Sequence, residues 1–208
     1  MKNLDYREYY RRNLPHFQPQ GATILVNFRL AGSLPTEVIK RLKEENERLD
    51  IRILETKEHD ERIKLREMMN RQHLDNWEDA LHSTTHGPFY MREDPIAEIV
   101  SNSILFHDGE WFDVEAFSIM PNHVHLVITP LEKTDGVYYG LTKIMHNIKR
   151  NSAKQANKLL GRTGPFWQHE SYDHYIRNHA EFQRIIEYVL QNPVKAGLVD
   201  DWTAWKWS

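Results

Sequence analysis

Two histidines separated by one residue, His123 and His125, offer the clearest chemistry in this sequence. They lie in an apolar run that follows a Pro-Asn pair and is typical of a β-strand. Because alternate side chains of a strand share a face, both imidazoles point the same way. Two neutral imidazoles held by one strand can bind a divalent metal ion. The alternative interpretation is a polar, solvent-facing side of an edge strand, with Val124, Leu126 and Ile128 in the core.

A tyrosine and an amide in the last part of the chain could complete such a site. Tyr188 and Asn192 are four residues apart, so on a helix they lie one turn apart. A phenol oxygen can attack a phosphodiester, and an amide oxygen can be a further metal ligand. The residues alone do not single out the nucleophile, because Tyr172 and Tyr175 stand almost level with Tyr188, although packing roles explain them better.

The segment from Gly136 to His169 contains no Asp or Glu, although the whole chain has a formal net charge of −3. Its apolar residues recur at helical spacing, so the basic side chains should face outward and form a positive field suited to phosphates. The alternative is a basic, solvated helix without a partner. The expected DNA-binding residues are Lys143, Lys149, Arg150, Lys154 and Arg162.

Composition narrows the functional classes. The chain has 208 residues and no cysteine, which excludes disulfides, zinc-thiolate sites and thiol nucleophiles. A chain of this length suits one domain, 1–208. No apolar run is long enough to span a bilayer and no signal peptide is evident, so we expect a cytoplasmic protein.

Hydrophobic patterning predicts a mixture of strands and helices. Residues 23–30 are β-branched and apolar, and 111–120 and 123–130 form a predicted hairpin. A short amphipathic helix is expected after Asp94, and the last helix should begin near Asn178 or His179 and end at Pro193. The aromatic tail, with Trp202, Trp205 and Trp207, should pack down.

Residues 36–82 form an insertion rich in charges of both signs. The i,i+4 spacing of opposite charges predicts one or two long helices, with a reversal near Ile51 to Lys57. A solvated structural hairpin is the favoured interpretation. A dimerisation or DNA-contact arm is the alternative, and the sequence also allows a homodimer.

Several motifs together resemble one family. They are Met120-Pro121-Asn122-His123-Val124-His125-Leu126, Trp167-Gln168, Tyr172-Asp173-His174 and the stretch from Tyr188 to Val199, Tyr-Val-Leu-Gln-Asn-Pro-Val-Lys-Ala-Gly-Leu-Val. The chain resembles the REP-associated tyrosine transposases, which belong to the single-tyrosine HUH superfamily, over about residues 20–35 and 87–207. The insertion is longer than in compact members.

The resemblance implies an α+β fold, with a ferredoxin-like antiparallel sheet and helices packed on it. It also implies Mg²⁺ or Mn²⁺ on His123 and His125, Tyr188 as the nucleophile, and Asn192 in place of a glutamine ligand. The implied activity is cleavage and joining of single-stranded DNA at hairpin-forming palindromes through a 5′-phosphotyrosine.

Two other functions compete with this hypothesis. A metal-dependent hydrolase would explain His-x-His, but the Asp and third His that usually follow at short spacing are absent after His125. A domesticated protein that binds DNA hairpins without cutting them is the second alternative. The presence of both histidines, Tyr188 and Asn192 argues against such decay.

Overall fold

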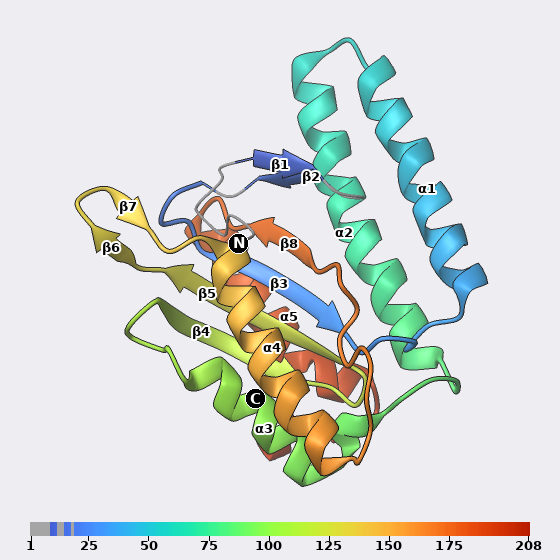
Figure 1. Ribbon diagram of the computed structural model, residues 1–208. Coiled ribbons are helices and arrows are strands. Elements are labelled where there is room, and N and C mark those ends of the chain that lie inside the picture. The colour runs from blue at the N-terminus through green and yellow to red at the C-terminus, as the bar shows by residue number, and fades with distance from the viewer. Residues whose placement is uncertain (1–8, 12–14, 18) are drawn as a thin grey trace. The chain divides into compact units, whose positions relative to one another are not determined.

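The computed structural model describes residues 9–11, 15–17 and 19–208. The chain divides into two compact units, Gly32–Pro88 and the remainder, which comprises the residues up to Ala31 and Phe89–Ser208. Each unit has its own secondary structure (Figure 1). Within the described residues, no helix is both long and apolar enough to cross a membrane.

The larger unit is built on a four-stranded antiparallel sheet. Its strands are β3 (Ile24–Arg29), β4 (Phe112–Ile119), β5 (His123–Pro130) and β8 (Tyr172–Tyr175), in the spatial order β4-β5-β3-β8. Helix α3 (Asp94–Leu105) precedes β4, and helix α4 (Leu141–Leu159) connects β5 to β8. This βαββαβ order with β3 and β5 in the middle is the ferredoxin-like arrangement, so the predicted fold class is confirmed.

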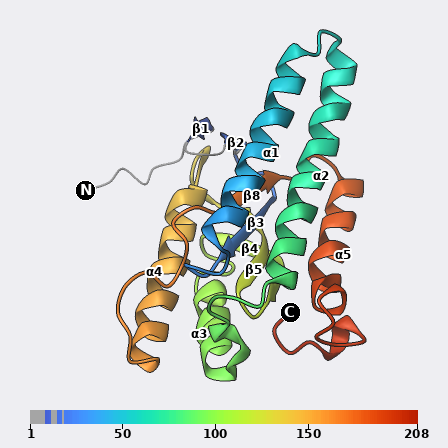
Figure 2. The same cartoon turned by 90° about the vertical axis from the view of Figure 1, so that its right-hand side faces the viewer.

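The two faces of the sheet differ in chemistry. On one face Ile24, Val26 and Phe28 of β3 join the apolar core with residues of α3 and α4. The opposite face carries Asn27 and Arg29, which pair in register with the two histidines of β5. Figure 2 shows α4 and helix α5 (His179–Lys195) on opposite sides of the sheet. The alternation of β3 therefore separates a packing face from a polar face.

Helix α5 is fixed at its start by the N-cap residue Asn178 and by Glu181 in the first turn. The Asn178 side chain accepts a hydrogen bond from the Glu181 backbone N–H, and the Glu181 carboxylate accepts one from the Arg177 backbone N–H. The predicted start is confirmed. The predicted end at Pro193 is wrong, because the helix continues to Lys195. A proline so close to the end removes only one hydrogen bond, and Ala196 N–H still bonds to the Asn192 carbonyl.

The smaller unit contains the charged insertion. Helices α1 (Thr36–Glu55) and α2 (His59–Ser83) are joined by a short connection, which confirms the predicted helical hairpin and its reversal close to Lys57. Pairs such as Lys40 with Glu44 and Arg41 with Glu45 follow the i,i+4 rule on an exposed face.

Short elements complete the chain. They are β1 (Tyr9–Arg11), β2 (Pro15–Phe17), β6 (Glu132–Thr134), β7 (Val137–Tyr138) and the 3₁₀ turns η1 (Tyr90–Arg92) and η2 (Trp202–Ala204). The C-terminal tail packs as expected at Trp205 and Trp207, since the Trp207 carbonyl accepts a hydrogen bond from Ile119 N–H and the Trp205 indole donates one to the Ile119 carbonyl. The expectation is wrong for Trp202, which is 37% exposed.

Candidate metal and nucleophile site

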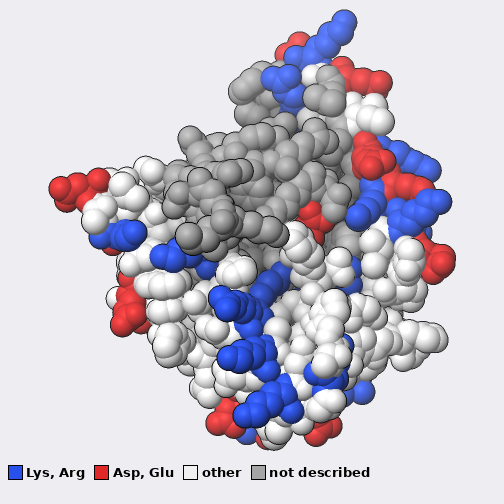
Figure 3. Space-filling model, viewed as in Figure 1, with Lys and Arg blue, Asp and Glu red and all other residues white. Residues whose placement is uncertain are grey.

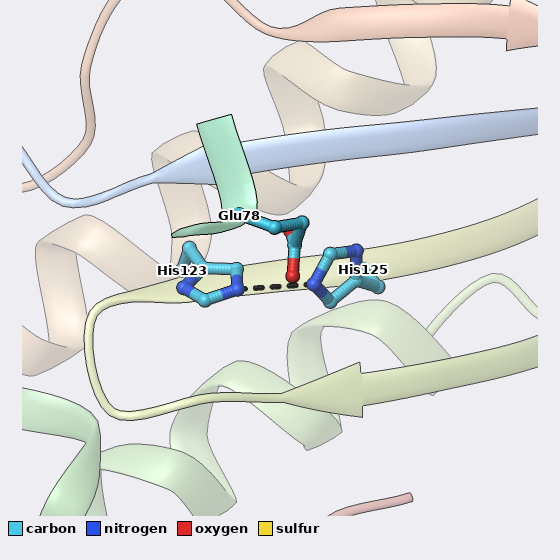
Figure 4. Close-up of side chains that lie close together, drawn as sticks. All are labelled: Glu78, His123 and His125. Carbon is cyan, nitrogen blue, oxygen red and sulfur yellow. Dashed lines mark hydrogen bonds between the residues drawn. The ribbon is translucent and has the colours of Figure 1, made fainter. Parts of the chain in front are cut away.

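His123 and His125 lie on β5, an interior strand bonded to β4 on one side and β3 on the other. Their exposed fractions are 1% and 0%, so the interpretation as a solvent-facing edge strand is wrong. The two Nε2 atoms are 3.0 Å apart, and Figure 4 shows this contact as a dashed line between the rings. The rings meet edge to face, with an interplanar angle of 85°.

The outer nitrogen of each ring faces an amide oxygen. His123 Nδ1 is 2.7 Å from Asn122 Oδ1, and His125 Nδ1 is 2.9 Å from Asn27 Oδ1. An amide oxygen only accepts hydrogen bonds, so both of these contacts are hydrogen bonds in the tautomer that carries the proton on each Nδ1. Both neutral rings then turn an Nε2 lone pair toward the other. Two acceptors at this separation repel unless a proton or a metal cation lies with them.

The observed geometry fits a divalent ion. Two ligands in adjacent octahedral positions, each about 2.1 Å from Mg²⁺, lie about 3.0 Å apart. This matches the 3.0 Å separation of the two Nε2 atoms. The imidazole pair can therefore hold a metal, with each Nδ1–H oriented by an amide as metal-ligating histidines usually are.

Asn192 adds a buried amide on α5. Its exposed fraction is 0%, and neither Oδ1 nor Nδ2 has a hydrogen-bond partner among the described residues. A buried amide without partners costs about 1–3 kcal/mol, so a structural role alone does not explain it. A metal ligand role for Oδ1 would satisfy one of these atoms.

Tyr188 lies one helical turn before Asn192, and α5 packs on β4 and β5. Its ring centroid is 5.5 Å from that of His125, and the two rings are nearly perpendicular at 87°. The Lys195 ammonium lies 5.0 Å from the centre of the Tyr188 ring. The structure thus brings together a phenol from the last helix and an imidazole from mid-chain, which no short-range pattern could show.

The two other tyrosines lie elsewhere on β8. Tyr175 pairs with Ile24 and packs against the apolar core. Tyr172 pairs with Asn27, so it shares the polar face with His125, but β3 lies between them. Burial, followed by the charge of Asp173, raises the pKa of Tyr172 above its usual range, which makes it a poorer nucleophile. The geometry favours Tyr188.

The expected DNA-binding residues separate into two groups. Arg150, Lys154 and Lys158 are exposed on α4 and Lys143 is half-buried near its start, and Figure 3 shows a column of basic side chains over this helix. The Lys143 ammonium lies over the rings of Trp111 and Tyr139, at 4.4 and 5.1 Å. We call Lys143, Arg150, Lys154 and Lys158 the α4 stripe.

Lys149 and Arg162 are engaged within the protein instead. Lys149 Nζ donates hydrogen bonds to the Gln168 carbonyl at 2.9 Å, the His169 carbonyl at 3.3 Å and Ser171 Oγ at 2.7 Å. Arg162 donates to Asn157 Oδ1 and the Pro165 carbonyl, at 2.9 and 3.2 Å. These side chains fasten the segment after α4, so they are less suited to phosphate contacts than the α4 stripe.

Sequence reasoning missed two polar residues of β3. Arg29 is buried, pairs in register with His123, and burial lowers its pKa to about 10. Asn27 accepts the hydrogen bond from His125. The available signal was an asparagine and an arginine inside an otherwise apolar strand, where Asn is disfavoured.

The region that holds the candidate site is similar to known transposases. Residues 96–192 match the family described as "Transposase IS200 like", a range that includes both histidines, Tyr188 and Asn192. A protein of Escherichia coli K12, named REP-associated tyrosine transposase, is 28% identical over 97 residues, which are 47% of this chain and 53% of that protein. A protein of Haemophilus influenzae, named as a candidate of the same kind, is 26% identical over 102 residues, which are 47% of this chain and 58% of that protein. The matches thus span little more than half the length of these curated relatives.

One solved structure matches nearly the whole chain. It is that of a REP-associated tyrosine transposase bound to a REP hairpin, with a TM-score of 0.52 and 16% sequence identity. The match covers 95% of this chain and 79% of that chain. At this identity the likeness establishes a common fold.

Proposed function

We propose, from the confirmed similarity to the REP-associated tyrosine transposases and from the geometry of the site, that this chain is a metal-dependent single-stranded DNA endonuclease and strand transferase. Its substrate would be a hairpin-forming repetitive palindrome, and its intermediate a covalent 5′-phosphotyrosine. The proposal rests on one observation. The Tyr188 ring lies against the ring of His125, whose Nε2 atom faces the Nε2 atom of His123.

His123, His125 and Asn192 would hold Mg²⁺ or Mn²⁺. When bound, such an ion polarises a phosphoryl oxygen and stabilises negative charge on the leaving oxygen. The protein orients the ligands through the hydrogen bonds at the Nδ1 atoms, and burial keeps competing water from the Nε2 atoms.

Tyr188 would act as the nucleophile. Its hydroxyl oxygen forms a bond to phosphorus while the hydroxyl proton passes to solvent, and the bond from phosphorus to the 3′-oxygen breaks. The leaving 3′-oxygen takes a proton from solvent, so the strand end departs as a 3′-hydroxyl. The phosphodiester energy is kept in the phosphotyrosine bond. Attack by another 3′-hydroxyl reverses the step, joins the strands and releases Tyr188.

The α4 stripe would bind the phosphate backbone of the hairpin. Three of its members, Lys143, Arg150 and Lys154, belong to the expected set, and they lie on a helix without acidic residues. We expect smaller contributions from Lys149 and Arg162 because the protein already uses their donors.

Incubation of the protein with a labelled hairpin oligonucleotide and Mn²⁺ tests the proposal. We expect a covalent adduct that resists denaturing electrophoresis, that Tyr188→Phe and chelation of the metal both abolish, and that His123→Ala abolishes while hairpin binding persists. Tyr188→Phe removes only the hydroxyl, so Tyr175→Phe is its matched control. Tight hairpin binding by wild-type protein without any adduct would instead support the non-cleaving binding protein.

A further inference from the structure

We propose that Asn27 is a positioning residue, which keeps the Nε2 atom of His125 available to the metal by holding the ring proton on Nδ1. This inference rests on the proposed function because it assumes that His123 and His125 bind a metal ion. Nothing in the motifs of β5 points to Asn27, which lies almost one hundred positions earlier in the chain.

The register of the sheet places Asn27 directly beside His125. The two residues are partners across β3 and β5, and Asn27 Oδ1 lies 2.9 Å from His125 Nδ1. The neighbours of Asn27 in β3 are Val26 and Phe28, which face the apolar core. An asparagine in such a strand is unfavourable for strand formation, so a specific hydrogen bond is the physical reason to find it there.

The alternative tautomer shows what Asn27 prevents. If His125 carried its proton on Nε2, that N–H would point at His123 Nε2, which is 3.0 Å away and accepts hydrogen bonds. The two rings would then satisfy one another, and the pair would have to lose this bond before a metal could enter. Asn122 fixes His123 in the same way at 2.7 Å, so both lone pairs remain directed at the same point.

Asn27→Leu and Asn27→Asp separate the hydrogen bond from packing. Leucine has a similar volume but no acceptor, whereas aspartate keeps an acceptor at the same place. Removing an outer-shell partner of a metal-ligating histidine typically lowers metal affinity about 10- to 100-fold. We expect a loss in this range for Asn27→Leu, measured by Mn²⁺ titration, and recovery of most of the affinity in Asn27→Asp.

Ring ¹⁵N NMR of the metal-free protein is a second test, which measures directly which ring nitrogen of His125 carries the proton. At a pH where the imidazoles are neutral, we expect His125 to carry its proton on Nδ1 in wild-type protein and in Asn27→Asp, and on Nε2 in Asn27→Leu. Asn151→Leu is a matched control, because it removes an asparagine hydrogen bond to Asn147 on α4, and its Mn²⁺ affinity should equal that of wild-type protein.

The outcomes distinguish this inference from the proposed function. Wild-type protein that binds no Mn²⁺, yet shows the proton on Nδ1 of His125, would refute the metal site while the tautomer assignment stands. Wild-type affinity in Asn27→Leu, or a proton on Nε2 in wild-type protein, would overturn the role of Asn27 and leave the proposed function intact. Circular dichroism shows whether Asn27→Leu folds. If it does not, the ¹⁵N spectrum of wild-type protein and the Mn²⁺ affinity of Asn27→Asp test the role of Asn27 instead.

Discussion

Arg150 and Lys149 are neighbours on α4 with the same charge, yet their surroundings differ, so we expect them to contribute differently to DNA binding. Arg150 is exposed on the α4 stripe, whereas the Lys149 ammonium donates three hydrogen bonds to residues 168–171. The pair therefore offers a matched test of whether DNA binding depends on charge in general or on this face of the helix. We expect Arg150→Gln to reduce the salt dependence of hairpin binding and Lys149→Met to leave it unchanged.

The expected size follows from counterion release. Each phosphate contact on duplex DNA contributes about 0.9 to the slope of log K against log salt concentration. Arg150→Gln should therefore lower the slope by about 0.9, and the triple substitution of Lys143, Arg150 and Lys154 by glutamine by about 2.7. When salt rises from 50 to 200 mM, affinity falls in both proteins. The factor of this fall should be about 40 times smaller for the triple variant than for wild-type protein.

Fluorescence anisotropy with a labelled hairpin over this salt range measures the slopes. Lys149→Met should instead lower the free energy of unfolding, by about 1–3 kcal/mol, because three acceptors lose a charged donor. Equal slopes in Arg150→Gln and wild-type protein would remove the α4 stripe from the DNA interface. Equal reductions in Arg150→Gln and Lys149→Met would show that the helix face does not matter.

Three further results are expected. Asn178→Ala should lower the free energy of unfolding by about 1 kcal/mol in urea denaturation, because α5 loses its N-cap; unchanged stability would mean that the cap is redundant. Burial raises the pKa of Glu181, but hydrogen bonds from Arg177 N–H and His174 outweigh it, so the net pKa lies below its usual value. The stabilisation is thus complete above the unfolded-state pKa and is lost as pH falls through the folded-state pKa. Wild-type protein should exceed Glu181→Gln in thermal stability at neutral pH and lose this advantage in acid, and a constant difference would contradict the assignment. Mn²⁺ at about one hundred times its dissociation constant should stabilise wild-type protein by about 2.7 kcal/mol, and should leave His125→Ala unaffected in the same thermal melt.

Local patterns in the sequence were sufficient for most elements. Apolar, β-branched runs located β3, β4 and β5, and the charged repeat located the helices of the insertion. The fold class came from the resemblance, because periodicity does not specify strand order. The error at Pro193 shows a limit of local rules, since a proline in the last turn costs one hydrogen bond and the packing of α5 can outweigh it.

The candidate site was harder to predict because its parts meet across strands. His123 and His125 could be found from their spacing, but the residues that orient them depend on register: Asn27 is opposite His125 only because β3 and β5 pair in that alignment. A shift of one residue would place Val26 or Phe28 there and turn Asn27 toward the apolar core. The same reasoning applies to Lys149 and Arg162, which the sequence analysis grouped with the other basic residues, since the helix repeat predicts which side a residue faces but not which distant segment it contacts. Lys149 meets the carbonyls of residues 168 and 169 only after the chain has left α4 and returned to the sheet. Functional residues that lie within one element can therefore be predicted from the sequence. Contacts that depend on pairing between elements can be identified only once the fold is known.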